Sequence, residues 1–503
     1  MSCLWPIILP VLHLTQLCSA LQSVSSSFTQ VPFLTVWNAP TANCLSLYGI
    51  DLDLGMFDIV HNQNQTFIGD NITIFYAEKL GLYPRYGNQG APINGGVPQN
   101  SSLEEHLRAA SDDIRLYIPT RDFQGLAVVD WESWRPVWER NWDTKQIYWE
   151  GSKALVWSKH PDWSPEQVET AARMEFEKAG RQFMEETLIL GRNEKPNGLW
   201  GFYGFPNCYN YYKSTNYTGE CPTIERKRND ELFWLWNVSS ALYPDIYLSL
   251  PLRDLDEEVY LYCHYRILEA MRAASQATPQ NPPVFPYARI VYTYSLDFLS
   301  QEHLVYTIGE SAALGSAGVV LWGDNMFSKS QATCDAVKSY IDETLGPYLV
   351  NVTSAAALCS QTLCSSHGRC QRRSANSGVY LHLDPSVWKI RSHKKPTGRR
   401  DYKVLGQLRQ RDVALMKAKF TCNCYPGWSG DRCSKHCTFN KTAMVSTVFV
   451  PSLFRCMRLI LLLGHVCPHL SQFGLRFSCF NNAFVTLRLC PSDQSTRLCP
   501  LLL

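Results

Sequence analysis

Between about residues 30 and 355, short apolar runs alternate with longer amphipathic segments, and this alternation limits the possible folds more than any other feature. The runs have the length and composition of strands, and the segments between them have the period of helices. Such a pattern over roughly 300 residues predicts an α/β fold of parallel βα units closed into a barrel. The expected strands are residues 33–38, 72–76, 125–132, 199–206, 245–250, 288–294 and 317–323, and the expected helices include 102–118, 164–191 and 255–276.

The expected helix 164–191 carries signals at both ends. Ser164 is a candidate N-cap, and Pro165 occupies the first helical position, where a missing N–H costs nothing. Gly191 is expected to end the helix.

Two carboxylates follow the third expected strand, in the stretch FQGLAVVDWESWRPVWERNWD. In barrels of parallel strands, chemistry takes place at the carboxyl ends of the strands. Asp130 and Glu132 are two positions apart, so on a strand both face the same side, about 6.6 Å apart along the backbone, while Trp131 faces away. Two such carboxyls in a partly apolar site oppose each other's ionisation, so one of them is expected to hold a proton. If the strand ends earlier, they are ordinary surface acids.

The composition and the N-terminus bear on partners and compartment. A net charge of +2 argues against a dedicated nucleic-acid binder. Residues 1–20 resemble a signal peptide: the apolar run Leu4–Leu14 is too short to span a membrane, and Cys18-Ser19-Ala20 suits cleavage after Ala20. We therefore expect the secretory pathway, with a secreted, lysosomal or cell-surface destination left open. The N-glycosylation sequons that support this route lie at Asn64, Asn71, Asn100, Asn216, Asn237, Asn351 and Asn440.

The chain becomes rich in cysteine after Asn351, and the oxidising route makes these cysteines candidates for disulfides rather than metal ligands. The stretch CNCYPGWSGDRC has the ending of an EGF-like module, which a polar, basic insert at residues 371–407 interrupts. Six cysteines allow fifteen connectivities, so the spacing alone leaves other pairings open. The apolar run LILLLGHV in the tail is too short for a membrane span. The expected division is 1–20 signal peptide, 21–355 barrel, 356–435 module and 436–503 an atypical, disordered tail.

From about Phe33 through Cys433, the chain resembles the hyaluronidases of vertebrates and bee venom. The matching motifs are long: TVWNAP, TIFYAEKLG, GGVPQNSSLEEHL, GLAVVDWESWRPVWERNWD, GLWGFYGFPNCYNY, WLWNVSSALYPDIYL, IGESAALGSAGVVLWGD and CSSHGRC. The resemblance implies a distorted (β/α) barrel with a small disulfide-rich EGF-like module on its C-terminal side. It also implies an endo-β-N-acetylhexosaminidase that hydrolyses β-1,4 bonds of hyaluronan, with chondroitin as a second candidate substrate. It suggests no cofactor and no metal.

The resemblance also implies a mechanism that retains configuration, in which the substrate's own N-acetyl oxygen attacks the anomeric carbon. Glu132 is then the general acid and afterwards the base, and Asp130 and Tyr247 position the acetamido group. The implied substrate contacts are Tyr76, Arg135, Tyr203 and Trp322. Two of these residues have an alternative role: Arg135 could form a structural ion pair, and Tyr76 could be buried in the core.

The family pattern implies five disulfides and leaves Cys263 as a buried free thiol. One departure is Asp245, where relatives commonly carry Ser. Its charge is expected to face the same side as Tyr247 and to repel a polyanion. This keeps alive an alternative function, a weakly active or inactive hyaluronan-binding or adhesion protein. The implied pairs are Cys44–Cys334, Cys208–Cys221, Cys359–Cys370, Cys364–Cys422 and Cys424–Cys433.

Overall fold

The computed structural model describes residues 26–212, 216–277, 281–394 and 400–437. The predicted signal peptide, the sequon at Asn440 and nearly all of the predicted tail lie outside the described residues. The chain up to Cys437 is one compact unit, which contains both the predicted barrel and the predicted module. Within the described ranges, no helix is both long and apolar enough to cross a membrane.

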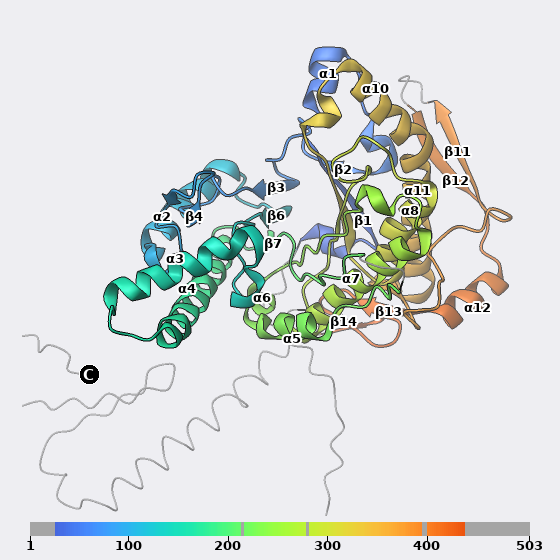
Figure 1. Cartoon of the computed structure of the whole chain (residues 1–503). Helices are drawn as coiled ribbons and strands as arrows, with labels where there is room; N and C mark the ends of the chain where they lie inside the picture. Colours follow the sequence, from blue (N-terminus) through green and yellow to red (C-terminus); the bar gives the residue numbers. More distant parts are fainter. Residues whose placement is uncertain (1–25, 213–215, 278–280, 395–399, 438–503) are drawn as a thin grey trace, which may run out of the picture. The chain divides into compact units, whose positions relative to one another are not determined.

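Two parallel sheets hold the strands that carry the site (Figure 1). One has the order β2-β1-β9-β8 and the other β3-β6-β7. Successive strands within each sheet are joined through helices, as the alternating sequence pattern predicts. The strands of these two sheets are Leu34–Asn38 (β1), Val60–His61 (β2), Ile72–Phe75 (β3), Leu126–Val129 (β6), Leu199–Phe202 (β7), Tyr287–Ala288 (β8) and Gly318–Trp322 (β9).

The two sheets are connected on both sides. Isolated bridges from Tyr203 to Tyr243 and from Asp245 to Tyr287 link β7 to β8 through an extended segment. This segment was expected to be the regular strand 245–250; it is held by single bridges instead and ends in a short 3-10 turn, Leu250–Leu252. On the other side, the Asn62 side chain donates to the Ile72 carbonyl (2.7 Å) and accepts from the Ile72 N–H (3.2 Å). A side-chain amide therefore takes the place of strand pairing between β2 and β3.

Alternate residues of the strands pack into separate cores, as expected for strands buried on both faces. Residues that point between the two sheets form one apolar cluster, and their neighbours pack outward against the helices. This alternation sets which side chains appear at the carboxyl ends of the strands. The inner cluster includes Leu34, Val36, Ile72, Ile74, Leu126, Val128, Leu199, Tyr243, Tyr287 and Val320.

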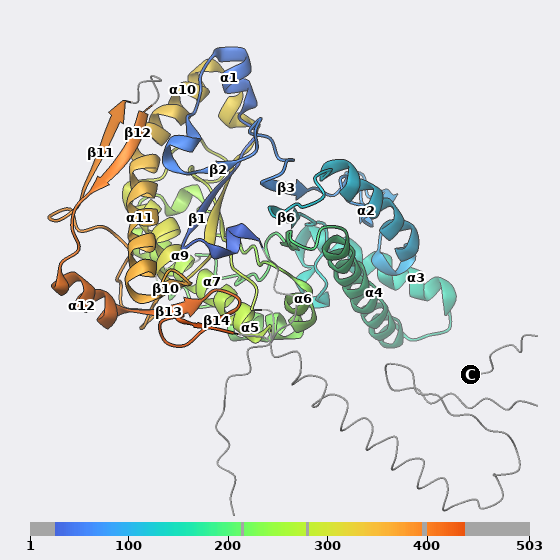
Figure 2. The same ribbon diagram turned by 180° about the vertical axis from the view of Figure 1, so that it is seen from behind.

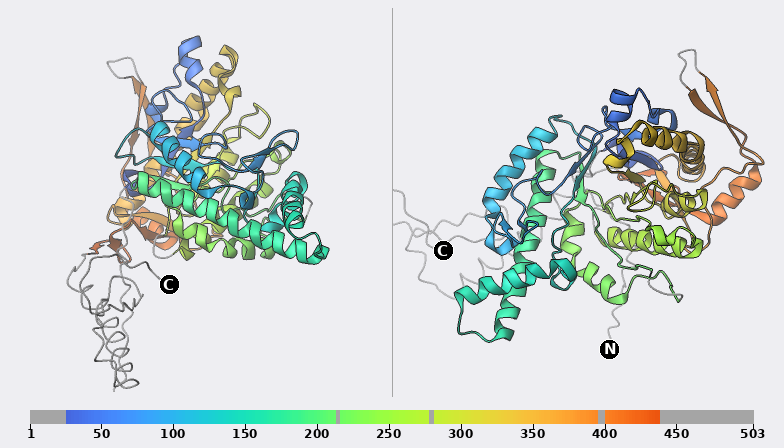
Figure 3. Two further views of the ribbon diagram at one scale, coloured as in Figure 1. Left: turned by 90° about the vertical axis from the view of Figure 1, so that its left-hand side faces the viewer. Right: turned by 45° about the horizontal axis from the view of Figure 1, so that its top comes forward.

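The helices divide between the sheets (Figures 1 and 2). Helices α2, α3 and α4 lie beside β3-β6-β7, and α7 and α11 lie on the side of the other sheet; Figure 3 shows the same division from two further directions. The helices are Ala42–Tyr48 (α1), Leu103–Tyr117 (α2), Gln146–Lys159 (α3), Pro165–Glu194 (α4), Thr223–Glu231 (α5), Phe233–Val238 (α6), Asp256–Gln276 (α7), Gln301–Leu304 (α8), Glu310–Ala313 (α9), Gln331–Tyr340 (α10), Gly346–Leu363 (α11) and Gln410–Lys419 (α12).

Helix α4 begins as predicted but ends later. Ser164 forms a capping box: its hydroxyl accepts from the Gln167 N–H (3.3 Å), and its own N–H donates to the Gln167 side chain (2.9 Å). The predicted end at Gly191 is wrong, because the helix continues to Glu194. Gly191 lies against the indole of Trp200, where an added Cβ would sit 2.7 Å from ring atoms. The glycine thus allows a close helix–strand approach and does not terminate the helix.

Gly191→Ala is expected to lower the stability of the fold by roughly 1–3 kcal/mol, because the methyl group overlaps the fully buried ring of Trp200. An alanine in an open helix position would instead stabilise the protein. Thermal unfolding of the variant measures the difference. Gly180→Ala in the same helix is the matched control, since its Cβ would approach Trp134 only to 3.3 Å; an equal loss in both variants would contradict the explanation.

The cysteine-rich region packs on α11. Its strands are all antiparallel pairs: β10 with β13, β11 with β12, and β14 with β15. The five predicted disulfides are present, namely Cys44–Cys334, Cys208–Cys221, Cys359–Cys370, Cys364–Cys422 and Cys424–Cys433, and Cys263 is free and buried. The remaining strands are Arg85–Tyr86 (β4), Pro92–Ile93 (β5), Gly368–Arg372 (β10), Lys389–Lys394 (β11), Arg400–Leu405 (β12), Phe420–Cys424 (β13), Trp428–Ser429 (β14) and Lys435–His436 (β15).

A buried ionic cluster ties this region to the helices of the parallel sheets. Arg372 on β10 donates two hydrogen bonds to Glu310 on α9 (2.7 and 2.8 Å), and His264 on α7 contacts the same carboxylate at 2.7 Å. The side chains of Arg372 and Glu310 are fully buried. Partners of this kind are costly to separate, so the cluster fixes β10 against α7 and α9.

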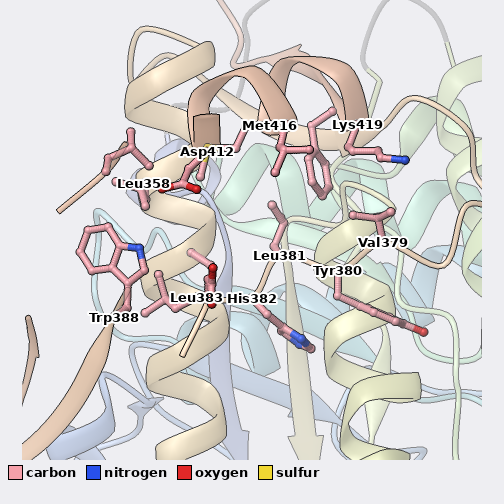
Figure 4. A pocket seen from close by; sticks show the side chains of 15 residues that line it. Leu358, Val379, Tyr380, Leu381, His382, Leu383, Trp388, Asp412, Met416 and Lys419 are labelled. Carbon is pink, nitrogen blue, oxygen red and sulfur yellow. The ribbon is translucent and has the colours of Figure 1, made fainter. Parts of the chain in front are cut away.

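An apolar pocket of about 170 Å³ lies between α11, residues 379–384 and α12 (Figure 4). Leu358, Leu381 and Met416 point into it, and Trp388 closes one side. None of its lining residues belongs to the carboxyl ends of the parallel strands.

Candidate active site

Asp130 and Glu132 follow strand β6, which ends at Val129, three residues before the expected end. The Asp130 N–H still donates to the Phe75 carbonyl of β3 (2.9 Å), so the alternation of sides persists beyond the strand. Trp131 is buried in the outer core, its ring stacked 4.5 Å from that of Tyr83. Asp130 is half-buried, whereas 58% of the Glu132 side chain is exposed. The two carboxylates therefore share one side of the backbone but differ in their access to water.

This difference determines which group holds a proton. Burial, together with the neighbouring charge of Glu132, raises the pKa of Asp130 to about 8, and Arg135 opposes the rise. Within the described residues, Oδ1 of Asp130 is buried and has no hydrogen-bond partner. Both effects favour the protonated form of Asp130 in the unliganded protein. That the pair holds one proton remains a prediction from the spacing, and the direction of this shift agrees with it.

Two cations hold the main chain at Glu132. Arg135 donates to the Glu132 carbonyl (3.2 Å), and its guanidinium lies 3.9 Å from the Glu132 carboxylate. The Lys145 ammonium donates to the same carbonyl. Burial, together with the charge of Arg135, lowers the pKa of Lys145 to about 8, and the charge of Glu132 opposes the fall. The structure brings predicted Arg135 to the acid itself; Lys145, which no strand period or motif singles out in the sequence, was missed.

Four predicted aromatic residues come together beside the carboxylates. The indole N–H of Trp322 donates to the Tyr76 hydroxyl (3.0 Å), and the Tyr247 ring lies 6.0 Å from the rings of both Trp322 and Tyr203. All four residues are half-buried. They come from four different strands or strand-like segments, so the parallel arrangement assembles one wall from distant parts of the chain.

The tyrosines of this wall are neutral hydrogen-bond donors and acceptors at ordinary pH. Burial raises the pKa values of Tyr76, Tyr203 and Tyr247 well above the usual range, and nearby acids such as Asp130 add to the rise. A neutral phenol hydroxyl can bind an amide oxygen or a sugar hydroxyl without carrying charge.

The sequence reading missed Asn38 and Arg289. Arg289 lies 4.8 Å from the Trp322 ring and donates to Asp324 (2.9 Å). Asn38 is fully buried, and neither atom of its amide has a partner among the described residues. The sequence did contain a signal for both residues, because every second residue of a strand points to the same side. Asn38 follows the inward-facing Leu34 and Val36, and Arg289 follows the inward-facing Phe285 and Tyr287.

Asp245 differs from its expectation as a free negative charge. The Arg266 guanidinium on α7 donates to its carboxylate (2.8 Å), and the Asn207 amide donates to its other oxygen (3.3 Å). The Arg266 side chain is 2% exposed. The carboxylate is therefore balanced by a buried cation, and the expected repulsion of a polyanion requires correction.

Comparison with known proteins is consistent along almost the whole described chain. Residues 22–437 match the family described as Hyaluronidase. Human Hyaluronidase-1 is 48% identical over 405 residues, which cover 80% of this chain and 92% of that protein. The hyaluronidase of Crotalus adamanteus is 44% identical over 420 residues, covering 83% of this chain and 93% of that protein.

Among solved structures, bee venom hyaluronidase in complex with a hyaluronic acid tetramer superposes with a TM-score of 0.59 and 32% sequence identity. The match covers 63% of this chain and 98% of the bee protein. A second, monoclinic crystal structure of the bee enzyme gives a TM-score of 0.58.

Proposed function

The chain belongs to the hyaluronidase family of glycoside hydrolases, and on that premise we propose that it is an endo-β-N-acetylhexosaminidase that cuts the β-1,4 bonds of hyaluronan. The observation that carries the proposal is the unequal pair after β6: a half-buried Asp130, whose pKa burial raises, and an exposed Glu132. Glycosidases need one carboxyl that donates a proton and a second group that stabilises charge at the sugar ring.

In the proposed reaction, Glu132 protonates the glycosidic oxygen of the leaving sugar. The carbonyl oxygen of the substrate's acetamido group forms a bond to the anomeric carbon as the glycosidic bond breaks. Asp130 and Tyr247 hold the acetamido group for this attack, Tyr247 as a neutral donor. Glu132 then removes a proton from the water that opens the intermediate, so configuration is retained.

The exposure of Glu132 suggests how the proton reaches the correct oxygen. In the free protein Glu132 faces water, and burial favours the protonated form of Asp130. A bound sugar chain covers Glu132 and removes it from water, which favours transfer of the proton to the oxygen facing the glycosidic bond. Arg135 and Lys145 keep the Glu132 main chain in place during this exchange.

The other side chains fit an anionic polysaccharide. The half-buried rings of Tyr76, Tyr203 and Trp322 offer flat surfaces to sugar faces. Lys145 places positive charge at the Glu132 carbonyl, and hyaluronan has a carboxylate on every second sugar. The bee enzyme was crystallised with a hyaluronic acid tetramer, which supports the same class of ligand here.

A purely binding protein on the same fold is the weaker candidate. It drew support only from Asp245 as a repelling charge, and Arg266 balances that charge. A binding protein also has no need of an unpaired carboxyl oxygen at its centre.

We further propose that the two sheets are halves of a distorted (β/α) barrel closed at Asn62, and that residues 356–435 are an EGF-like module. Five disulfides support passage through the secretory pathway. Of the sequons, Asn64, Asn100 and Asn216 are exposed and are the best candidates for glycans; Asn71, Asn237 and Asn351 are half-buried.

Release of reducing ends from purified hyaluronan and from chondroitin, between about pH 3.5 and 7.5, tests the proposal. Turnover of hyaluronan supports it, with the rate on chondroitin fixing the breadth of specificity. A folded protein that binds hyaluronan and releases no reducing ends at any pH would establish the binding protein instead.

Asp245→Asn is expected to lower stability by about 1–3 kcal/mol, since it leaves the buried Arg266 without its counter-charge. The KM for hyaluronan is expected to change less than about twofold, because the wild-type charge is already balanced. Thermal unfolding and steady-state kinetics at low salt measure the two effects. The control is Asp230→Asn, which breaks a more exposed pair with Arg272. A marked fall in KM for Asp245→Asn would restore the repulsion hypothesis.

A further inference from the structure

The basic insert folds into the hairpin β11–β12, whose two faces differ in character. Ile390, Tyr402 and Val404 pack against the core, and the ring of Tyr402 lies 5.2 Å from that of Phe57. In Figures 1 and 2 the hairpin stands at the edge of the described fold, beside α11 and opposite α2, α3 and α4. Because strand residues alternate between faces, the intervening residues point outward.

Three cations occupy the outward face. Lys389 and Arg391 on β11 and Lys403 on β12 are exposed, and Arg391 is in direct register with Lys403. Within the part of the chain that the structure describes, none of the three has an ion pair or a side-chain hydrogen bond. The face is therefore a cluster of unpaired positive charge on a backbone that the inner face holds in place.

This cluster works against the hairpin's own stability. Like charges directly opposite each other on neighbouring strands are destabilising. Charged side chains can protect the edge strand of a sheet from unwanted pairing with another strand. Charges of either sign give this protection, so it does not explain why the charges here are all positive. Between Lys389 and Lys403 the sequence contains seven Lys and Arg and one Asp, in a chain whose net charge is +2. The described exposed cations Lys389, Arg391 and Lys403 put charge of one sign on a solvent-facing strand pair, which suits an anionic ligand.

We propose that Lys389, Arg391 and Lys403 form a binding surface for sulfated glycosaminoglycans, separate from the chemistry at Glu132. Along and across the strands these cations are spaced by roughly 5–7 Å. Sulfated glycosaminoglycans carry several anionic groups on each disaccharide and can engage all three cations together. Hyaluronan, with one carboxylate on each disaccharide, cannot. The surface would hold the protein on sulfated matrix polymers while the site beyond β6 remains open.

Heparin, as the probe, tests the proposal with the full-length protein, while a saturating hyaluronan tetrasaccharide occupies the site at Glu132. Arg391→Glu/Lys403→Glu is expected to weaken heparin binding at least about tenfold and to make it less sensitive to NaCl. The rate of hyaluronan hydrolysis is expected to be unchanged. Lys178→Glu, on an exposed position of α4, is the control and is expected to bind like the wild type.

The single variant Arg391→Glu separates binding from folding. It creates an opposite-charge pair with Lys403, so its melting temperature is expected not to fall while heparin binding weakens. Equal heparin binding by the wild type and the double variant would overturn the proposal. So would loss of heparin binding when the tetrasaccharide is added, or a preference of this surface for hyaluronan over heparin.

Discussion

Glu132→Gln is expected to reduce turnover of hyaluronan by about 10²–10⁴-fold, because it removes the group proposed to donate and accept the proton at the glycosidic oxygen. The glutamine keeps the size of the side chain and cannot supply the proton. Glu132 is largely exposed and pairs only at 3.9 Å with Arg135, so the change is expected to leave the fold intact. The measurement is kcat on polymeric hyaluronan, with thermal unfolding alongside.

The matched control is Glu139→Gln, a partly exposed acid seven residues along the chain that pairs with Arg173 on α4. It is expected to retain nearly full activity. Retention of substantial activity by folded Glu132→Gln would rule out Glu132 as the acid. Equal losses in both variants would indicate a general electrostatic effect.

Asp130→Asn is expected to lower kcat by about 10²–10³-fold and at the same time to stabilise the protein. Activity falls because an amide cannot stabilise positive charge that develops on the acetamido group. Stability rises because the folded protein no longer holds a carboxyl whose pKa is raised to about 8 by burial. The gain is expected to be roughly 1–2 kcal/mol at pH 8, allowing for the part of the side chain that water still reaches.

The pH dependence of this gain has a definite sign. The pKa of Asp130 is higher in the folded protein than its ordinary value of 3.8, so the folded state binds the proton more tightly. The wild type therefore loses stability as pH rises from about 4 to 8, and the loss is complete above pH 8. The melting temperature of Asp130→Asn relative to wild type should rise across the same range. A constant difference would contradict the raised pKa.

The parts of this fold that follow local rules were accessible from the sequence. Five of the seven expected strand regions contain a parallel strand, and a sixth, 288–294, overlaps the two-residue strand β8 only at Ala288. The capping box at Ser164 was signalled by its residues. The end of α4 could not be predicted from the sequence. Gly191 is needed there because the ring of Trp200, on another element, packs against it. The segment 245–250 was predicted as regular because its composition is that of a strand, yet it pairs only at single residues.

The site shows the same limit. Asp130, Glu132 and the aromatic wall were predicted from spacing and from family motifs. Arg289 and Asn38 followed from the same period-two rows and were missed because the rows were not continued to the ends of their strands. The contact of Lys145 with the Glu132 carbonyl and the Asp245–Arg266 ion pair could not be predicted from the sequence. Both depend on how loops and α7 pack in the folded protein.

We propose that this chain hydrolyses hyaluronan with retention of configuration through the pair Asp130 and Glu132, and one experiment tests this directly. The most direct measurement is proton NMR of the new reducing end during the first turnovers of hyaluronan, before mutarotation. If configuration is retained, the N-acetylglucosamine end appears first as the β anomer. First appearance of the α anomer, or no new reducing end from folded protein, would contradict the proposal.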